Sequence, residues 1–394
     1  MNKNLYSYIH IPFCDQKCGY CRFASIGSTQ KFQISKYVHS LVDEVRTSPL
    51  TPLLQERGIG VFVPPSPVGE GIQGGGYLKS IYFGGGTPSV LELSQIKMIL
   101  DTMESKYCFD PDIEITLETT PINVTKENLQ NWKKLGINRI SMGVQTLSTK
   151  SLDEIGRGNK GDIIQALDLL QERGIDNISL DFIIGLPYVE KGEIKKDIEY
   201  ILDAYSFIKH ISVYLLEEYY NEDKIIETKY DKVTYPDDWN KLGIKDEDYL
   251  AEYREIKKFL KSRGFHSYEI SNFSQPGYEC KHNQAYWNHS QIVAFGLGAY
   301  GYTNGVRYRN SDSFNEYYKR EKKVQELSNS EDLFLEKIMF QLRTSGIEQS
   351  LYSQLDTNKI NLFIKDGYLK EENSVIKLED KGVLVMDYIL KEII

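Results

Sequence analysis

Apolar residues recur along the first half of this chain in short runs, separated by longer amphipathic stretches. Short apolar runs bounded by glycine or proline are typical of buried strands, whereas apolar positions spaced three or four residues apart indicate helices. The pattern predicts strands at 5–11, 80–83, 112–118, 137–145, 176–185 and 209–216. It predicts helices at 32–46, 94–105, 125–135, 161–173 and 190–204. Such an α/β alternation favours a parallel sheet covered by helices, and six strands suit a partial (β/α)6 barrel better than a closed eight-stranded one.

The alternation is interrupted at residues 47–78. This stretch contains five prolines and a run of three glycines, Gly74–Gly76. Proline removes backbone donors and glycine adds chain entropy, so neither a helix nor a strand ladder is expected here. No Lys-Ser or Lys-Thr pair follows the glycines, which argues against a phosphate-binding loop. We predict a disordered insertion within a barrel domain that spans residues 1–216.

Two further regions follow the barrel. Residues 217–325 are rich in tyrosine and irregular apart from a helix at 247–263, and we interpret them as an extension of the barrel. Residues 326–394 combine helical periodicity with a hairpin-like pair at 367–378 and a last helix, an order that resembles a winged helix. From Glu331 onward the tail has 12 acidic and 8 basic residues. That balance favours a structural or docking role over DNA binding.

Composition and charge narrow the class of protein. Hydrophobic residues make up 41% and charged residues 26% of the 394-residue chain, as expected for a protein with a sizeable core. The net charge of −9 disfavours a general nucleic-acid binder. We find no apolar run long enough to span a bilayer and no basic-then-apolar leader, so we expect a cytoplasmic protein. Five cysteines, three of them clustered, fit a reducing compartment.

The three clustered cysteines lie directly after the first predicted strand. Cys14, Cys18 and Cys21 have the spacing C-x3-C-x2-C. Soft thiolates select iron–sulfur clusters or zinc, and a zinc site usually adds a fourth Cys or His at a characteristic spacing that is missing here. A [4Fe-4S] cluster with three cysteine ligands leaves one iron open to a small molecule. Ordinary buried thiols are the plainer alternative, but this spacing in a strand-to-loop position favours the cluster.

Polar residues also follow the other predicted strands. Gly84–Thr87, Glu118, Gln145 and Asp181 all stand at or near strand ends, as Cys14 does. The carboxyl ends of parallel strands form the rim at which such folds bind ligands. A lysine partner for Glu118, or a capping role for Gln145, would explain each residue singly. Five such positions on one rim favour a binding site.

These motifs together resemble a known family. The cysteine spacing, Gly84–Pro88 (GGGTP), Gly143–Gln145 (GVQ) and Leu180–Pro187 (LDFIIGLP) resemble the radical S-adenosylmethionine (SAM) superfamily. With His282–Trp287 (HNQAYW), the chain is similar to its oxygen-independent coproporphyrinogen III oxidase-like branch. The similarity runs nearly end to end outside 47–78. It implies a [4Fe-4S] cluster whose open iron binds SAM for reductive cleavage.

The resemblance also implies roles for individual residues. Tyr8, Gly85 and Glu118 match positions that contact the cluster-bound SAM. Six others match positions that contact a second SAM in the oxidase: Tyr20, Gly86, Thr87, Gln145, Arg157 and Asp181. Whether one or two SAM molecules bind stays open at this point.

Two features separate the oxidase from the HemW group of heme chaperones within this branch. The oxidase has a further cysteine where this chain has Phe23, and a long extension before the first strand, which begins here at about Leu5. Both features favour the HemW group and argue against a true coproporphyrinogen III oxidase. The resemblance then implies that the extension at 217–325 forms a tetrapyrrole site. It makes His282 a candidate heme ligand, with Tyr286 and Trp287 against the porphyrin. A histidine bonded to backbone is the plainer reading of His282.

The resulting hypothesis is a heme-binding protein that delivers heme to acceptor proteins, which could also bring it to a membrane surface. The alternative is a radical SAM enzyme that acts on a tetrapyrrole, by coproporphyrinogen III decarboxylation or heme ring opening, or a related methyltransferase. An enzyme of this kind would need an electron donor.

Overall fold

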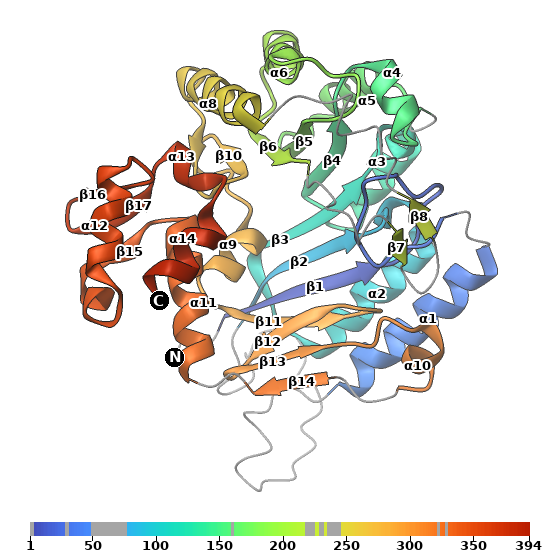
Figure 1. The fold of residues 1–394 in the computed structure, drawn as a ribbon. Coiled ribbons are helices and arrows are strands. Elements are labelled where there is room, and N and C mark those ends of the chain that lie inside the picture. Colours follow the sequence, from blue (N-terminus) through green and yellow to red (C-terminus); the bar gives the residue numbers. More distant parts are fainter. Residues whose placement is uncertain are drawn as a thin grey trace, which may run out of the picture.

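The computed structural model describes residues 4–27, 31–48, 77–158, 161–216, 225–227, 232–234, 246–320, 324–327 and 330–394. Figure 1 shows a curved sheet with helices on its outer side and a smaller unit of helices and short strands beside it. The predicted insertion at 47–78 lies, except for its two ends, outside the described residues.

Six parallel strands form the centre of the sheet. They are β1 (Leu5–Ile11), β2 (Leu78–Gly85), β3 (Phe109–Thr119), β4 (Arg139–Gln145), β5 (Ile178–Ile184) and β6 (His210–Leu215). Each strand pairs in parallel with the next one along the chain. The predicted α/β fold with a partial barrel of parallel strands is therefore confirmed.

The helices that connect these strands cover the outer face of the sheet (Figure 1). They are α1 (Lys31–Thr47), α2 (Leu93–Lys106), α3 (Lys126–Lys134), α4 (Thr149–Glu154), α5 (Ile163–Glu172) and α6 (Glu193–Ala204). Side chains cap some of their first turns: Thr125 accepts from the backbone of Asn128, and Asp162 from that of Gln165. Such caps satisfy amide groups that have no partner within the helix. The pattern predicted every helix of this set except the short α4.

The two faces of the strands differ in chemistry. Along β2 to β6 alternate side chains point toward the helices, and these side chains are apolar and fully buried, for example Ile81, Leu117 and Leu180. Successive strand residues point to opposite faces, so the positions between them face the barrel interior. These interior positions are polar or aromatic: Tyr8, Ser80, Tyr82, Glu114, Thr116, Glu118, Arg139, Ser141, Ser179, Asp181, His210 and Ser212. The barrel interior is thus built to hold polar groups, while the apolar core lies between sheet and helices.

The chain after β6 adds strands to both edges of the sheet. On one side β11 (Gln291–Phe295) pairs in parallel with β1 and is followed by antiparallel β12 (Tyr300–Thr303), β13 (Val306–Arg309) and β14 (Val324–Leu327). On the other side β10 (Asn272–Ser274) and β9 (His266–Ser267) continue antiparallel from β6. The sequence pattern did not predict these additions. The remaining elements here are the hairpin β7 (Ile225–Glu227) and β8 (Lys232–Thr234) and the helices α8 (Asp246–Ser262), α9 (Lys281–Trp287) and α10 (Phe314–Tyr318).

One large hydrophobic cluster runs from Leu5 to Tyr317, so the extension shares its core with the barrel. The glycine-rich stretch after β11 permits a close approach: a Cβ at Gly296 would lie 2.5 Å from the carbonyl oxygen of His10. The domain boundaries given above stay a prediction.

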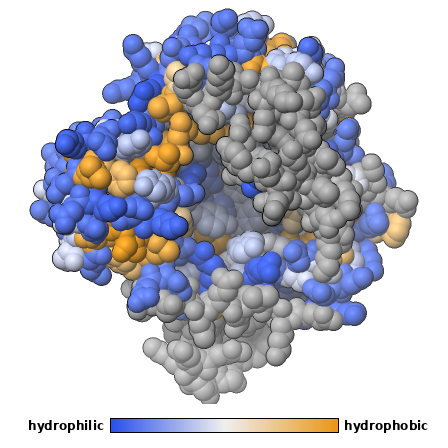
Figure 2. Space-filling view, viewed as in Figure 1, coloured by the Kyte–Doolittle hydropathy of each residue, from blue (hydrophilic) through white to orange (hydrophobic). Residues whose placement is uncertain are grey.

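The C-terminal residues form a unit with its own hydrophobic cluster, from Ile338 to Ile393. Its elements are α11 (Ser330–Arg343), β15 (Ile347–Glu348), α12 (Thr357–Lys365), β16 (Leu369–Glu372), β17 (Val375–Leu378), α13 (Asp380–Val383) and α14 (Met386–Ile393). The three strands pair in the order β15-β17-β16, and the succession of elements is that expected of a winged helix. Apolar patches lie on its surface, at left in Figure 2. None of the described helices is both long and apolar enough to span a bilayer.

Candidate cluster and cofactor site

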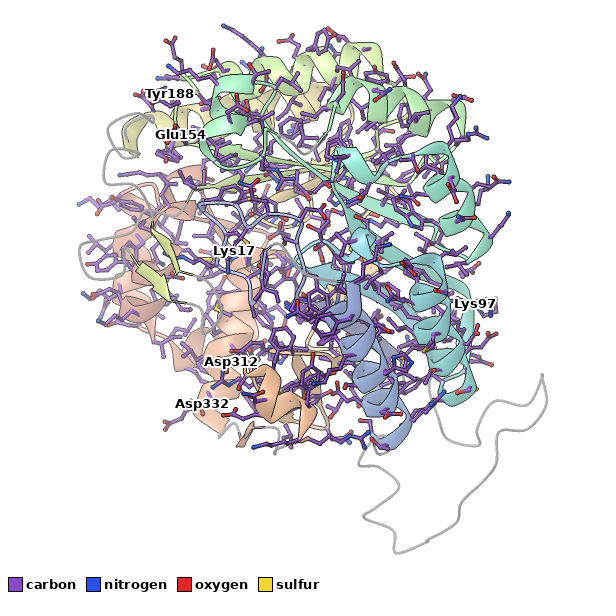
Figure 3. All side chains as sticks on the ribbon, turned by 90° about the vertical axis from the view of Figure 1, so that its right-hand side faces the viewer. Lys17, Lys97, Glu154, Tyr188, Asp312 and Asp332 are labelled. Atoms are coloured by element: carbon purple, nitrogen blue, oxygen red, sulfur yellow. The ribbon has the colours of Figure 1, made fainter. Side chains whose placement is uncertain are left out.

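The loop after β1 carries the three cysteines and is closed by backbone hydrogen bonds. The amide of Cys14 donates to the carbonyl of Ile26 (2.9 Å), and the amide of Ile26 donates to that of Pro12 (2.9 Å). In Figure 3 the labelled Lys17 of this loop lies near the centre of the view. Its ammonium group donates to the carbonyl oxygens of Phe23 (3.2 Å) and Ser25 (3.0 Å), which braces the loop from within.

The glycine-rich stretch after β2 lies against this loop. The amide of Gly86 donates to the carbonyl of Ile11 (2.9 Å), and that of Thr87 donates to Phe13 (2.7 Å). A Cβ at Gly86 would lie 2.5 Å from the carbonyl oxygen of Phe13 and 2.9 Å from its nitrogen. Because backbone atoms cannot yield as a flexible side chain can, only glycine fits at this position. The GGGTP motif therefore holds the cysteine loop at the end of the sheet.

The three thiols lie in one polar environment. Cys14 and Cys18 are buried, and Cys21 is half-buried. Thr87 Oγ1 lies 3.6 Å from Cys14 Sγ, and a guanidinium nitrogen of Arg157 lies 3.7 Å from Cys18 Sγ. Burial, followed by the neighbouring thiol of Cys18, raises the pKa of Cys21 to about 11. A hydroxyl and a cation placed beside sulfur favour the thiolate form that a metal requires.

This donor set fits an iron–sulfur cluster better than a single ion. Within the described ranges, no three His, Cys, Asp or Glu side chains converge closely enough to hold one metal ion. Thiolates of a [4Fe-4S] cluster bind different irons and so do not meet at one point. Burial of Cys14 and Cys18, together with the two donors to sulfur, is the environment such a cluster needs.

A buried carboxyl lies on the rim beside the glycines. Glu118, at the end of β3, accepts from Tyr82 Oη (2.8 Å) and from the amide of Gly85 (3.0 Å). Burial is the main cause that raises the pKa of Glu118 to about 7, and the nearby carboxyl of Asp181 adds to it. Both hydrogen bonds act in the opposite direction because they favour the ionised form. Glu118 can therefore change its charge near neutral pH.

Tyr8 and His10 connect this rim to the cysteine loop. Tyr8 Oη lies 3.0 Å from His10 Nδ1, and His10 Nε2 lies 2.8 Å from the carbonyl oxygen of Ala24. Burial lowers the pKa of His10 to about 4, so the imidazole is neutral at pH 7. A Cβ at Gly85 would lie 2.5 Å from this ring, in a backbone conformation with φ of +111°. Both facts explain a glycine there.

The last two predicted rim residues differ in position: Gln145 ends β4, whereas Asp181 lies in the middle of β5 and not at its end. Gln145 closes β4 with φ of 71°, a left-handed conformation that is uncommon outside glycine. Asp181 accepts from Ser141 (3.3 Å) and Ser179 (3.2 Å), and burial raises its pKa. Arg157 links this side to the loop, since it donates to Tyr20 Oη (3.2 Å) as well as approaching Cys18.

His282 lies on α9 and meets one of the rim residues, because its ring stacks on that of Tyr8 with centroids 6.1 Å apart. Its Nδ1 is hydrogen-bonded to Ser80 Oγ (3.0 Å), and its ring stacks on Tyr82 with centroids 5.0 Å apart. Its Nε2 is buried and has no hydrogen-bond partner among the described residues. Burial, followed by the charge of Arg139, lowers the pKa of His282 to about 3. The side chain is a neutral imidazole, and in the tautomer in which Nδ1 donates to Ser80 the lone pair of Nε2 is free to ligate a metal.

Glu114 holds α9 in place, and neither it nor the buried Arg139 was predicted as a site residue. Glu114 accepts from the amides of Lys281 (3.2 Å) and His282 (3.3 Å) and from Cys280 Sγ (3.5 Å). Arg139 is 1% exposed within the same polar interior. The alternation Asp-Ile-Glu-Ile-Thr-Leu-Glu in β3 was the available signal, because its acidic positions all fall on one face.

A parallel barrel with three thiols and a glycine-rich edge at its carboxyl rim is the architecture of a radical SAM protein. Residues 8–201 match the family model described as the Radical SAM superfamily. Membership of this superfamily implies a [4Fe-4S] cluster and SAM.

Curated relatives identify the group within the superfamily. The heme chaperone HemW of Synechocystis sp. is 35% identical, over 79% of this chain and 69% of the relative. That of Lactococcus lactis is 29% identical, over 95% of this chain and 93% of the relative. The HemW of Escherichia coli is 25% identical, over 98% and 96%. This chain belongs to the HemW family.

A solved structure shows the same fold. Coproporphyrinogen III oxidase (HemN) from Escherichia coli, described as a radical SAM enzyme, superposes with a TM-score of 0.75 and 18% identity. The similarity covers 99% of this chain and 90% of that one. The C-terminal unit is thus part of an arrangement that both proteins share.

Proposed function

We propose that this protein is a heme chaperone that binds heme, carries a SAM-coordinating [4Fe-4S] cluster and passes heme to acceptor proteins. The observation that carries the proposal is the neutral imidazole of His282, with its unpartnered Nε2, on a chain whose relatives are named heme chaperones along almost its full length. Phe23, where the oxidase has a cysteine, supports the same conclusion.

Cys14, Cys18 and Cys21 would ligate the cluster. When bound, the cluster supplies one electron at low potential and an open iron for SAM. Thr87 and Arg157 donate toward two of the sulfurs and so would stabilise the thiolates and set the potential.

Tyr8, Gly85 and Glu118 would surround SAM at the cluster. The carboxyl of Glu118 is held by Tyr82 and by the backbone of Gly85, so it is oriented before any ligand arrives. An ammonium group beside it would favour the ionised form and lower its pKa. Tyr20, Gly86, Thr87, Gln145, Arg157 and Asp181 form the second set of candidate contacts. Arg157 and Thr87 already approach the cysteine sulfurs, which supports a role in orienting the cluster.

His282 would ligate the heme iron through Nε2. Ser80 fixes the ring from the opposite nitrogen, an arrangement typical of histidines that ligate metals. Tyr82 stacks on one face of the ring and Tyr286 lies edge-on to it, with centroids 5.2 Å apart. These contacts hold the imidazole still, which lowers the entropic cost of ligation.

Cluster binding and heme binding are tested by separate measurements. Anaerobically reconstituted protein should contain about four irons per chain, and Cys18→Ala should lose the cluster absorbance. Heme titration should show stoichiometric binding, and His282→Ala should weaken it. His39→Ala is the matched control, because that histidine bonds only to the carbonyl of Ser35 on the exposed side of α1.

Two results with the same reconstituted protein would contradict the proposal. A fully loaded cluster in Cys18→Ala would refute the ligand assignment. No heme absorbance, together with substrate-dependent release of 5′-deoxyadenosine, would instead make the protein a radical SAM enzyme that acts on a tetrapyrrole and needs an electron donor.

A further inference from the structure

A second histidine lines a cavity next to α9. The cavity has a volume of about 180 Å³ and lies between the end of α9, β12, β13 and α11. Six of its lining residues matter here: Tyr286, His289, Tyr302, Arg307, Glu336 and Phe340. None of them belongs to the cluster rim. We call this cavity the His289 pocket.

His289 lies directly after the last turn of α9. Its φ of 50° is the left-handed conformation that commonly ends a helix, and the amide of Ser290 donates to the carbonyl of Ala285 (2.9 Å) across this turn. The ring packs edge-on against Phe340, with centroids 4.7 Å apart, and against Tyr302 at 5.8 Å. Its Nε2 is buried and has no hydrogen-bond partner in the described part of the chain. Burial lowers the pKa of His289, so this imidazole is neutral at pH 7, like that of His282.

An ion pair closes the opposite side of the pocket. Glu336, on α11, pairs with Arg307 of β13, and its side chain is only 12% exposed. The second carboxylate oxygen of Glu336 lies 3.7 Å from His289 Nε2, near enough to shield it but beyond hydrogen-bonding distance. Glu336 thus covers the imidazole nitrogen and occupies the guanidinium that could otherwise bind an external carboxylate.

Tyr286 connects this pocket to the first histidine. It lines the cavity, and its ring also lies edge-on to the ring of His282. His282 is 2% exposed, so a large planar ligand cannot meet it from solvent without a rearrangement. His289, with a side chain 24% exposed, stands on the outer side of the same tyrosine.

We propose that the His289 pocket is an outer heme site, in which His289 ligates the iron, Arg307 binds a propionate and Glu336 must turn away to admit them. This inference rests on the proposed function, since it specifies where the cargo of a heme chaperone first binds. Pockets that enclose drug-sized molecules measure roughly 300–1,000 Å³, so this cavity holds one edge of a porphyrin and leaves the rest uncovered. The ring of Tyr300, 54% exposed at the rim, extends the aromatic surface for that remainder. Partial exposure suits a protein that must hand its ligand over.

Heme titration of four full-length proteins tests the proposal: wild type, His289→Ala, Glu336→Ala and the control His39→Ala. His289→Ala should weaken heme binding by about tenfold or more and shift the Soret band. Glu336→Ala should bind heme more tightly and faster, because it uncovers Nε2 and frees Arg307. Circular dichroism shows whether each variant is folded. Added imidazole should restore protein-bound heme in His289→Ala, as measured after gel filtration, which a merely structural role would not produce.

The outcomes separate this inference from the proposed function. If His289→Ala titrates like wild type while His282→Ala loses heme, the outer site is refuted and the chaperone function stands. If Glu336→Ala weakens binding, the shielding role is refuted. If wild type binds no heme, both proposals fail together.

Discussion

The carboxyl of Glu118 gives a prediction about stability that needs no cofactor. Its pKa rises from an ordinary 4.5 to about 7 because the fold buries it. Below the pKa that Glu118 has in the unfolded chain, its carboxyl is protonated in both the folded and the unfolded state and does not change the free energy of unfolding. As pH rises from there, the unfolded chain ionises first, so folding loses stability until the folded group ionises as well near pH 7. Glu118→Gln keeps an oxygen that can accept from Tyr82 or Gly85 but cannot ionise.

The size of the effect follows from the shift. A pKa difference of 2.5 corresponds to about 3 kcal/mol when both states are fully ionised. Between about pH 5.5 and about pH 8, where the folded group titrates, the loss amounts to roughly 2 kcal/mol. Glu118→Gln should therefore gain stability relative to wild type over that interval. For a chain of this size the gain corresponds to roughly 4 °C or less in Tm.

The assay compares the Tm of apo-protein and variant by circular dichroism at a series of pH values. Only the pH dependence of the difference in Tm between variant and wild type is informative, because other titrating groups contribute equally to both proteins. Glu104→Gln, on an exposed position of α2, is the control and should show a flat difference. A difference between Glu118→Gln and wild type that also stays flat from about pH 5.5 to about pH 8 would refute the reasoning about burial.

Two further predictions concern the cysteine loop. Gly86→Ala places a Cβ against the backbone of Phe13. It should lower the free energy of unfolding by roughly 1–3 kcal/mol and reduce the iron content after reconstitution. An iron content and an unfolding midpoint equal to those of wild type would contradict this prediction. Arg157→Met removes the cation beside Cys18 and the donor to Tyr20, so the reconstituted cluster should have a lower reduction potential, measured by EPR-monitored titration. An unchanged or higher potential would show that Arg157 does not act on the cluster.

The local features of this protein were readable from the sequence. Buried strands produce apolar runs, so all six central strands were predicted, with ends that differ from the structure by up to three residues. The cysteine spacing and the glycines of GGGTP are local in the same sense. Gly86 packs on the backbone of Phe13, where only glycine fits, and the same steric constraint would apply to any sequence with this loop.

Tertiary structure decided what depends on residues far apart in the chain. The pairing of β11 with β1 joins residues separated by most of the chain, and no local pattern encodes such a register. The same holds for the stacking of His282 on Tyr82 and for the meeting of His289 with Glu336. The raised pKa of Glu118 also comes from burial, which only the assembled fold provides. Sequence therefore determined the central strands, the cysteine spacing and the glycine motif, because periodicity and spacing are local, whereas the charges and neighbours of these groups were set by long-range packing.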